Sequence, residues 1–205
     1  NKEVEDLLKA KKIKWQSKRI LFAIKESKLL ESVATFPKLK ECIELIMGKE
    51  MDLFQSLNFY ESSQQRTHSD SIHMTTFPQG NILAVWVALQ DVGPQDGPLH
   101  YYPGSHKLPY AMNKDFDNLS TSFKLGNKSY TDYEDKIEQI IKDNAQLKKE
   151  IFLPKKGDVL IWHANLLHGA EAKIDPKSSR KSMVFHFYAS DAIAYHEITE
   201  RPTLK

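Results

Sequence analysis

Residues 81–107 read NILAVWVALQDVGPQDGPLHYYPGSHK, and this stretch decides the class of fold. A short apolar run at 81–90 leads into a turn rich in Gly, Pro and Asp, and a second short apolar run follows at 98–102. Short runs of aliphatic and aromatic residues bounded by such turns are typical of antiparallel strands. We therefore expect antiparallel β-structure in this part of the chain.

Three further strands are expected on either side of this stretch, at residues 51–60, 158–163 and 181–190. Residues 3–50 are different, because their apolar residues recur at helical intervals. Pro37 and Gly48 suit the start and the end of a helix. The periodicity therefore predicts N-terminal helices followed by antiparallel sheets, which is a mostly-β fold with flanking helices.

One helical segment is expected to interrupt the strands. Residues 132–148 carry an apolar stripe that ends at Leu147, and a polar stretch beginning at Asn113 precedes them. Long insertions between strands often act as lids or binding loops. We expect residues 113–150 to form such an insertion within a single domain that spans residues 1–205.

The composition predicts one sizeable hydrophobic core. The chain has 205 residues, of which 40 % are hydrophobic. Its 29 basic and 27 acidic side chains nearly cancel, so the charge gives no reason to expect nucleic acid or a membrane as a partner. The one basic run, residues 9–18, is expected to form the solvated face of a helix.

The single cysteine, Cys42, excludes an intrachain disulfide. No secretory signal or transmembrane run is visible in the sequence, so we expect a protein of the reducing cytoplasm. The sequence carries no signal for a particular oligomeric state.

A candidate metal site lies at residues 67–70, Thr-His-Ser-Asp, shortly after the expected strand 51–60. Alternate side chains of an extended segment point to the same side, so His68 and Asp70 would face one cation together. A third ligand must come from elsewhere, and residues 157–169 (GDVLIWHANLLHG) offer a strand and two histidines. Three ligands on one side of an octahedral iron(II) leave three positions for a chelating cosubstrate and oxygen.

The His-x-Asp motif is weak evidence when taken alone, because the chain has eight histidines and a lone histidine is more often a surface or core residue than a ligand. Two of them, His73 and His163, are near enough to the candidate ligands to line a pocket. Three others lack a matching carboxylate and are expected at the surface: His100, His106 and His196.

Arg180 lies twelve positions after His168 and opens the expected strand 181–190. A cosubstrate with a free distal carboxylate needs a cationic and preferably bidentate partner, which an arginine at this place would provide. Without the histidines, an ordinary surface arginine is the better interpretation.

With these residues in view, the sequence resembles the phytanoyl-CoA dioxygenase family. The first similar block runs from Gln64 to Tyr110 and contains THSD and VWVALQDVGPQDGPLHYYPGSHK. The second is GDVLIWHANLLHGA at residues 157–170, followed by Arg180. The N-terminal helices and the insertion at 113–150 lie outside the specific part of the resemblance.

The resemblance implies an iron(II)- and 2-oxoglutarate-dependent dioxygenase built on a double-stranded β-helix, the jelly-roll core of cupin-like proteins. It implies iron bound by His68, Asp70 and His168, 2-oxoglutarate anchored by Arg180, and Trp86 lining the cosubstrate pocket. O2 and a small-molecule substrate are the implied partners, with hydroxylation of an unactivated C–H bond as the reaction. Halogenating relatives lack the carboxylate that Asp70 provides, so its presence favours hydroxylation.

One position departs from the family pattern. Some members have a serine two residues beyond the distal histidine that helps to hold the cosubstrate carboxylate, and here that place is Ala170. Ser182 or Tyr60 is expected to provide the hydroxyl instead.

Two related classes fit the sequence less well. Nucleic-acid demethylases of the wider superfamily carry a second arginine six positions after the first, where this chain has His186. Protein hydroxylases usually anchor the cosubstrate through a lysine on another strand. The residues expected near a substrate are mixed polar and aromatic: His73, Met74, Tyr101, His163 and Asn165.

Two alternatives come from other classes of function. A non-catalytic or sugar-binding jelly roll would explain the strands but not the joint placement of His68, Asp70, His168 and Arg180. A cupin-type metal isomerase would require more histidines and a glutamate. The Pro-Gly-Ser-His sequence at residues 103–106 is interpreted as a structural turn rather than as catalytic chemistry.

Overall fold

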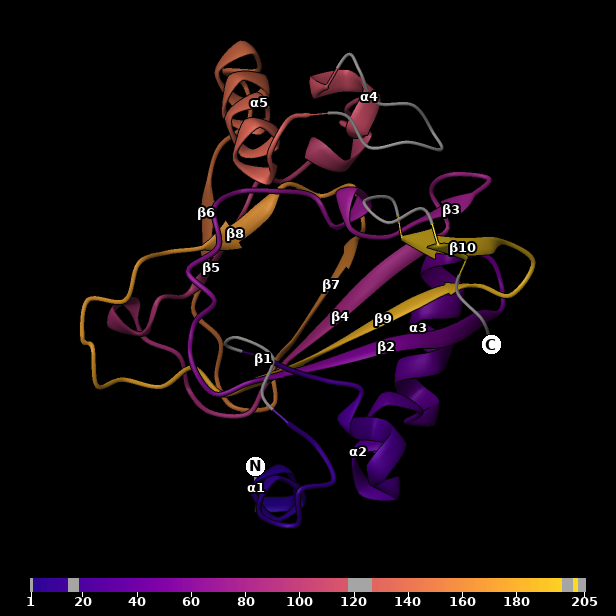
Figure 1. Ribbon diagram of the computed structural model, residues 1–205, viewed down its shortest axis with the longest axis vertical. Coiled ribbons are helices and arrows are strands. Elements are labelled where there is room, and N and C mark those ends of the chain that lie inside the picture. Colours follow the sequence, from indigo (N-terminus) through magenta and orange to yellow (C-terminus); the bar gives the residue numbers. More distant parts are fainter. Residues whose placement is uncertain (1, 15–18, 118–126, 197–200, 203–205) are drawn as a thin grey trace.

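Helices cover one face of a large antiparallel sheet, and a smaller sheet faces the other side of it (Figure 1). The computed structural model describes residues 2–14, 19–117, 127–196 and 201–202. The α-helices are α1 (Lys2–Lys9), α2 (Lys28–Ala34), α3 (Pro37–Met47), α4 (Asn113–Phe116) and α5 (Tyr130–Asp143). The short 3-10 helices are η1 (Ala23–Glu26), η2 (Asp70–Ile72), η3 (Pro94–Asp96) and η4 (Ser105–Lys107).

The strands pair in antiparallel fashion in three sheets. They are β1 (Arg19–Leu21), β2 (Met51–Phe59), β3 (Thr75–Phe77), β4 (Ile82–Ala88), β5 (Leu99–Tyr101), β6 (Glu150–Phe152), β7 (Val159–His163), β8 (His168–Ala170), β9 (Ser182–Ala189), β10 (Ile193–His196) and β11 (Arg201–Pro202). The large sheet has the order β1-β2-β9-β4-β7, and the small sheets have the orders β6-β5-β8 and β11-β10-β3.

The alternation of side chains along the central strands builds two hydrophobic layers. On β4, Leu83 and Val85 belong to the core beneath α1, α2 and α3. Ala84 and Trp86 belong to the core on the opposite face, which also contains Leu99 of β5. Burying both faces explains why β4 reads as a continuous apolar run, and the expected strands at 51–60, 81–90 and 181–190 are confirmed.

The expectation that residues 3–50 form helices is wrong where the structure has a strand. Residues 19–21 form β1, whose Ile20 pairs with Asn58 of β2. The period there is two, because Ile20 is buried in the helix-side core while Leu21 turns to the other face. Of the basic run 9–18, residues 10–14 lie outside any helix and residues 15–18 lie outside the described residues.

The expected ends of α3 are confirmed. Pro37 is its first residue, where a missing N–H has no cost, and Gly48 ends it with φ 64°. Because only glycine adopts a positive φ without strain, Gly48 suits this left-handed end.

The helix expected at residues 132–148 is α5, which is shorter and begins earlier. Ser129 caps it by accepting a hydrogen bond from the Asp132 amide, and Asn144 ends it. Leu147 therefore lies beyond the helix. Residues 118–126 of the expected insertion lie outside the described residues. None of the described helices is long and apolar enough to cross a membrane.

Candidate metal centre

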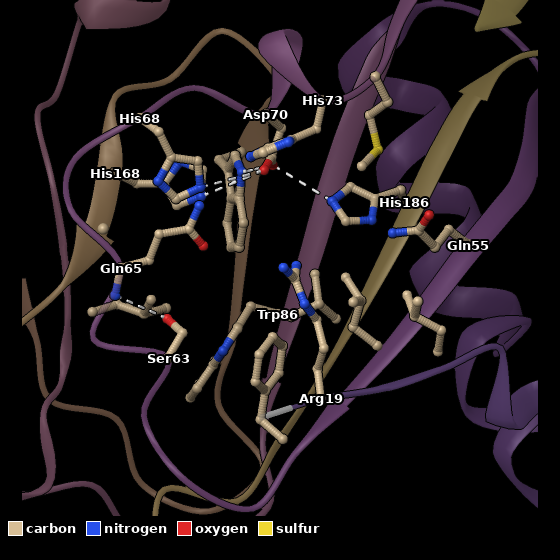
Figure 2. Close-up of a pocket in the computed structure, with 18 of the residues that line it drawn as sticks. Arg19, Gln55, Ser63, Gln65, His68, Asp70, His73, Trp86, His168 and His186 are labelled. Atoms are coloured by element: carbon tan, nitrogen blue, oxygen red, sulfur yellow. Dashed lines mark hydrogen bonds and ion pairs between the residues drawn. The ribbon is translucent and has the colours of Figure 1, made fainter. Parts of the chain in front are cut away.

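A cavity of about 480 Å³ opens between the large sheet and the small sheet that contains β5 and β8, and the predicted site residues line it (Figure 2). Its walls include His68, Asp70 and His168 together with Trp86 and Arg180. The structure therefore brings into one cavity all five residues that the sequence singled out.

The three candidate ligands converge from two segments: His68 and Asp70 lie just before and at the start of η2, and His168 is the first residue of β8. The ligand atoms of His68, Asp70 and His168 lie within 4.8 Å of one another, and all three residues are buried. The two histidines are held by their backbones, because each amide donates to the other residue's carbonyl over 2.9 Å. Ser69 between His68 and Asp70 is extended, with φ −107° and ψ 151°, so both side chains face the same side as expected.

Hydrogen bonds behind the imidazoles orient their free nitrogens. The Nδ1 of His68 lies 2.8 Å from the Arg66 carbonyl, and the Nδ1 of His168 lies 2.9 Å from the Leu166 carbonyl. Because a carbonyl only accepts, both Nδ1 atoms carry the proton and both Nε2 atoms have a lone pair. These Nε2 atoms lie 3.9 and 3.7 Å from Oδ1 of Asp70. This is the arrangement of metal-binding histidines, whose other ring nitrogen usually donates to a backbone carbonyl or a carboxylate.

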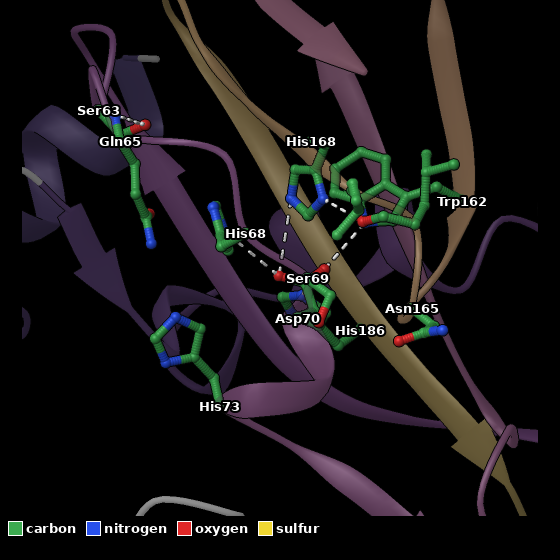
Figure 3. Close-up of polar contacts among 12 residues, drawn as sticks. Ser63, Gln65, His68, Ser69, Asp70, His73, Trp162, Asn165, His168 and His186 are labelled. Carbon is green, nitrogen blue, oxygen red and sulfur yellow. Dashed lines mark hydrogen bonds and ion pairs between the residues drawn. The ribbon is translucent and has the colours of Figure 1, made fainter. Parts of the chain in front are cut away.

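Trp162 of β7 orients the carboxylate. Its indole Nε1 donates to Oδ2 of Asp70 over 2.9 Å, which leaves Oδ1 directed at the imidazoles (Figure 3). His186 of β9 lies on the same side as the indole, with its Nε2 3.5 Å from Oδ2. One carboxylate oxygen is thus held by the protein and the other is free to bind a cation.

The electrostatics of the centre favour a neutral imidazole and an ionised carboxylate. Burial, and then the neighbouring His168, hold the pKa of His68 well below its ordinary value. Burial raises the pKa of Asp70, but the imidazoles of His168, His186 and His68 outweigh burial and hold that pKa below its ordinary range. A metal ion binds a neutral imidazole and an ionised carboxylate, so these protonation states suit metal binding.

Arg180 is a buried cation without an anionic partner among the described residues. Its side chain is 2 % exposed, Nη1 donates to the Gly97 carbonyl over 2.9 Å, and Nε has no hydrogen-bond partner. Burial lowers the pKa of Arg180 to about 10, so it remains charged at neutral pH. Burying an unpaired charge is costly, and a bound carboxylate would relieve that cost.

Trp86 lies on the interior face of β4 and is 2 % exposed. Its cross-strand neighbours are Val184 of β9 and Leu160 of β7. Trp86, Val184 and Leu99 together give the cavity an apolar wall.

Neither hydroxyl expected to replace the serine at Ala170 lines the cavity. Tyr60 belongs to the helix-side core, where burial, and then Glu5, raise the pKa of its phenol to about 12. Ser182 is fully buried and its hydroxyl has no partner among the described residues. It shares the interior face of β9 with Val184 and His186 and pairs with Phe59, but it is not itself part of the cavity lining.

Only two of the five expected substrate contacts line the cavity, namely His73 and Met74. Tyr101 instead pairs with His168 across the small sheet. His163 accepts from the Asn165 amide, and the side chain of Asn165 donates to the carbonyls of His106 and Leu108. Tyr101 thus belongs to the small sheet, whereas His163 and Asn165 hold loops together.

The turn at residues 103–106 is structural, as expected. Gly104 has φ 85°, and the buried Ser105 accepts a hydrogen bond from the Leu167 amide over 2.9 Å. The prediction of a surface position for His100 is wrong. The ring of His100 is buried against Gly169, and it contacts Thr67 over 2.8 Å.

Several cavity residues escaped the sequence analysis. Trp162, His186, Gln55, Gln65 and Arg19 all line the cavity. The first three share one row of the sheet, because Gln55 and Ala84 both pair with His186 and Ala84 also pairs with Trp162. Strand alternation alone predicts that Trp162 faces the interior. The alignment of Gln55, His186 and Trp162 in one row can be predicted only when the order of the strands is known.

Helix α5 supports the loop that carries His68 and Asp70. The Tyr133 hydroxyl accepts from the Ser69 amide over 2.9 Å, and the Tyr130 hydroxyl shares a hydrogen bond of 3.0 Å with His73. Arg66 forms ion pairs with three carboxylates on α5: Glu134, Asp135 and Glu138.

The fold and this site define a class, that of jelly-roll proteins with a His–Asp–His metal site between their sheets. Comparison with known proteins then identifies the family. The model of the phytanoyl-CoA dioxygenase (PhyH) family matches residues 6–182, so the chain belongs to this family.

Curated relatives agree with this membership. The chain is 24 % identical over 170 residues to phytanoyl-CoA dioxygenase domain-containing protein 1 of Danio rerio, which covers 80 % of this chain and 54 % of that protein. It is 22 % identical over 169 residues to the peroxisomal phytanoyl-CoA dioxygenase of Bos taurus, covering 79 % of this chain and 47 % of the relative. The chain thus spans about half the length of the curated relatives it matches.

Solved structures confirm the fold. The non-heme alpha-ketoglutarate-dependent carbocyclase SnoK from nogalamycin biosynthesis superposes with a TM-score of 0.71 at 19 % identity, covering 94 % of this chain and 74 % of SnoK. EctD from S. alaskensis, solved with 2-oxoglutarate and 5-hydroxyectoine, gives a TM-score of 0.67 at 22 % identity, covering 92 % of this chain and 66 % of EctD. The predicted double-stranded β-helix (jelly-roll) core is therefore confirmed.

Proposed function

We propose that this chain is a non-haem iron(II)- and 2-oxoglutarate-dependent oxygenase that hydroxylates a small molecule. The observation that carries the proposal is the joint presence, in one cavity, of three convergent metal-ligand side chains and a buried arginine without an anion. Family membership supports the same chemistry. SnoN, a structural relative, was solved with Fe3+ and alpha-ketoglutarate.

The donor set fits iron. Two imidazole nitrogens and one carboxylate oxygen are the ligands of the facial arrangement that non-haem iron oxygenases use. We assign His68, Asp70 and His168 as the ligands. Bound iron(II) supplies the redox chemistry that couples the decarboxylation of 2-oxoglutarate to the oxidation of a substrate C–H bond. The proposed net reaction consumes one substrate C–H bond, one O2 and one 2-oxoglutarate, and yields the corresponding alcohol, succinate and CO2.

The side chains of the protein would orient the reactants and exclude water. The backbone carbonyls of Arg66 and Leu166 fix the tautomers of the two histidines, and Trp162 fixes the carboxylate. We assign Arg180 to the distal carboxylate of 2-oxoglutarate, where its planar guanidinium offers two parallel donors. The apolar wall that includes Trp86 excludes water and strengthens this ion pair.

Hydroxylation is the finer part of the proposal, because relatives of this fold include a carbocyclase and an epimerase. Asp70 supports oxygen transfer, since it occupies the position that halogenating relatives leave open for a halide. The single cysteine is a free thiol, which is compatible with a reducing compartment. A cytoplasmic location therefore stays a prediction.

The test is production of succinate by anaerobically purified protein that receives iron(II), 2-oxoglutarate and then oxygen, with His168→Ala and Arg180→Ala measured in parallel. Slow turnover without substrate is common in this class, so the substrate need not be known. We expect iron-dependent succinate that disappears in His168→Ala. Folded protein that neither binds 2-oxoglutarate in the presence of iron nor forms succinate would support a non-catalytic or sugar-binding jelly roll instead.

A further inference from the structure

A second arginine, Arg19, reaches the same cavity from the edge strand β1 (Figure 2). Arg19 pairs with Phe59 of β2, and Leu21 pairs with Leu57. All four of these residues line the cavity, whereas Ile20 between them is buried on the helix side. The alternation of β1 therefore directs Arg19 inward.

Arg19 has no ion pair and no side-chain hydrogen bond with any other described residue. Arg66 provides the contrast, because its guanidinium contacts three carboxylates of α5. Arg19 nevertheless lines the same cavity as His73 and Asp70.

The charges of the cavity do not cancel. Among the described Arg, Lys, Asp and Glu side chains, those that line it are Arg19, Arg180 and Asp70. A divalent metal ion and the 2-oxoglutarate dianion would balance each other. With Asp70 on the metal and Arg180 on the cosubstrate, the loaded cavity would keep one positive charge, at Arg19. An excess positive charge in a cleft attracts an anion and raises its local concentration.

We propose that Arg19 binds a carboxylate of the substrate, so that the natural substrate is a small organic acid. This inference rests on the proposed oxygenase function and names its substrate class. A carboxylate matches both the single unbalanced charge and the planar fork of the guanidinium. A phosphate dianion would bring a second negative charge that no further cavity residue of the described chain balances.

The two arginines differ in a way that assigns them different partners. Arg180 is 2 % exposed at the inner wall, whereas Arg19 is exposed at the edge of the large sheet. The inner position suits a cosubstrate that binds first, and the exposed position suits a substrate that enters afterwards. Gln55 lines the cavity on β2 next to this strand, is 6 % exposed, and offers an amide for a second polar contact.

The experiment uses oxygen-free protein loaded with iron(II) and saturated with 2-oxoglutarate. Its thermal unfolding is followed with matched pairs of probes, benzoate against benzamide and hexanoate against hexanamide. The variants are Arg19→Gln, Arg19→Lys and Arg180→Gln. Lys12→Gln is the charge control, because Lys12 is exposed on the same N-terminal segment and does not line the cavity. Direct binding of 2-oxoglutarate is measured for each.

We expect the acids to raise the unfolding temperature more than the amides in the wild type and in Lys12→Gln. Arg19→Gln should weaken acid binding by about tenfold or more, the effect of losing one charge-assisted hydrogen bond, and Arg19→Lys should retain part of it. Binding of 2-oxoglutarate should be unchanged in Arg19→Gln and weakened in Arg180→Gln.

Three results would overturn the inference. The wild type could show no preference for acids, Arg19→Gln could keep that preference, or Arg19→Gln could weaken 2-oxoglutarate binding as much as Arg180→Gln does. The last result would make Arg19 a cosubstrate residue. Failure of the proposed function is a separate outcome, recognised by the absence of iron-dependent 2-oxoglutarate binding in the wild type.

Discussion

Replacing Trp162 with phenylalanine should weaken iron binding while leaving all three ligands in place. Trp162 is 6 % exposed, and its indole N–H donates to Oδ2 of Asp70 over 2.9 Å. In Trp162→Phe this oxygen loses its donor. The carboxylate is then free to rotate away from the imidazoles, and part of its negative charge is left buried without compensation.

The magnitude follows from the charge on the acceptor. A hydrogen bond to a charged group contributes about 1.5–3 kcal/mol, and each 1.4 kcal/mol is a factor of ten in affinity. We therefore expect the dissociation constant of iron(II) to rise about 10- to 100-fold, the range found when residues behind metal ligands are changed. Loss of the larger ring should also lower the free energy of unfolding by about 1–3 kcal/mol.

The assay is an anaerobic titration of metal-free protein with iron(II) against a competing chelator, in the absence of 2-oxoglutarate. Trp86→Phe is the matched control, since Trp86 is also buried on the interior face of the large sheet but does not contact Asp70. It should lose stability and keep its affinity for iron. Equal affinities in the wild type and Trp162→Phe, or equal losses in the two variants, would refute the role given to the indole.

Three further changes probe other contacts. Gly169→Ala should lower the free energy of unfolding by about 1–3 kcal/mol in urea, because a Cβ there would lie 2.7 Å from the ring of His100; an unchanged midpoint would contradict this close packing. The metal-free protein should lose stability as the pH falls from 6.5 to about 4. In that window the unfolded state binds a proton that His73, whose pKa burial and Arg19 lower, does not accept; the pH slope should be smaller in His73→Gln. Arg66→Ala should speed hydrogen exchange in α5 with little change in global stability, since two of the three ion pairs of Arg66, those with Asp135 and Glu138, are exposed; slower or equal exchange would count against the link.

The elements that could be predicted from the sequence are those long enough to show a regular pattern of apolar residues. The strands over 81–90 and 181–190 were recognisable because both faces of β4 and β9 are buried and their apolar runs are long. Strands of three residues, such as β1 and β8, are too short to show a period. Arg19–Leu21 becomes a strand because β2 offers an open edge for pairing, which is a tertiary effect.

The site likewise contains residues that the local sequence identifies and residues that only the tertiary structure brings together. His68 and Asp70 were found because they lie two positions apart in the sequence, and the structure places His168 beside them through a backbone bridge. Arg180 was found because the family pattern places it after His168. Alternation along β7 places Trp162 on the interior face, but its contact with Asp70 and the position of Arg19 in the cavity depend on the order of the strands.

The central claim is that one cavity binds iron through its His–Asp–His group and 2-oxoglutarate through Arg180. Equilibrium dialysis of labelled 2-oxoglutarate against oxygen-free protein, with and without iron(II), tests it directly. We predict one 2-oxoglutarate bound per chain only when iron is present, with binding lost in His168→Ala and strongly weakened in Arg180→Gln. Binding that does not depend on iron, or that is equally tight in Arg180→Gln, would contradict the account.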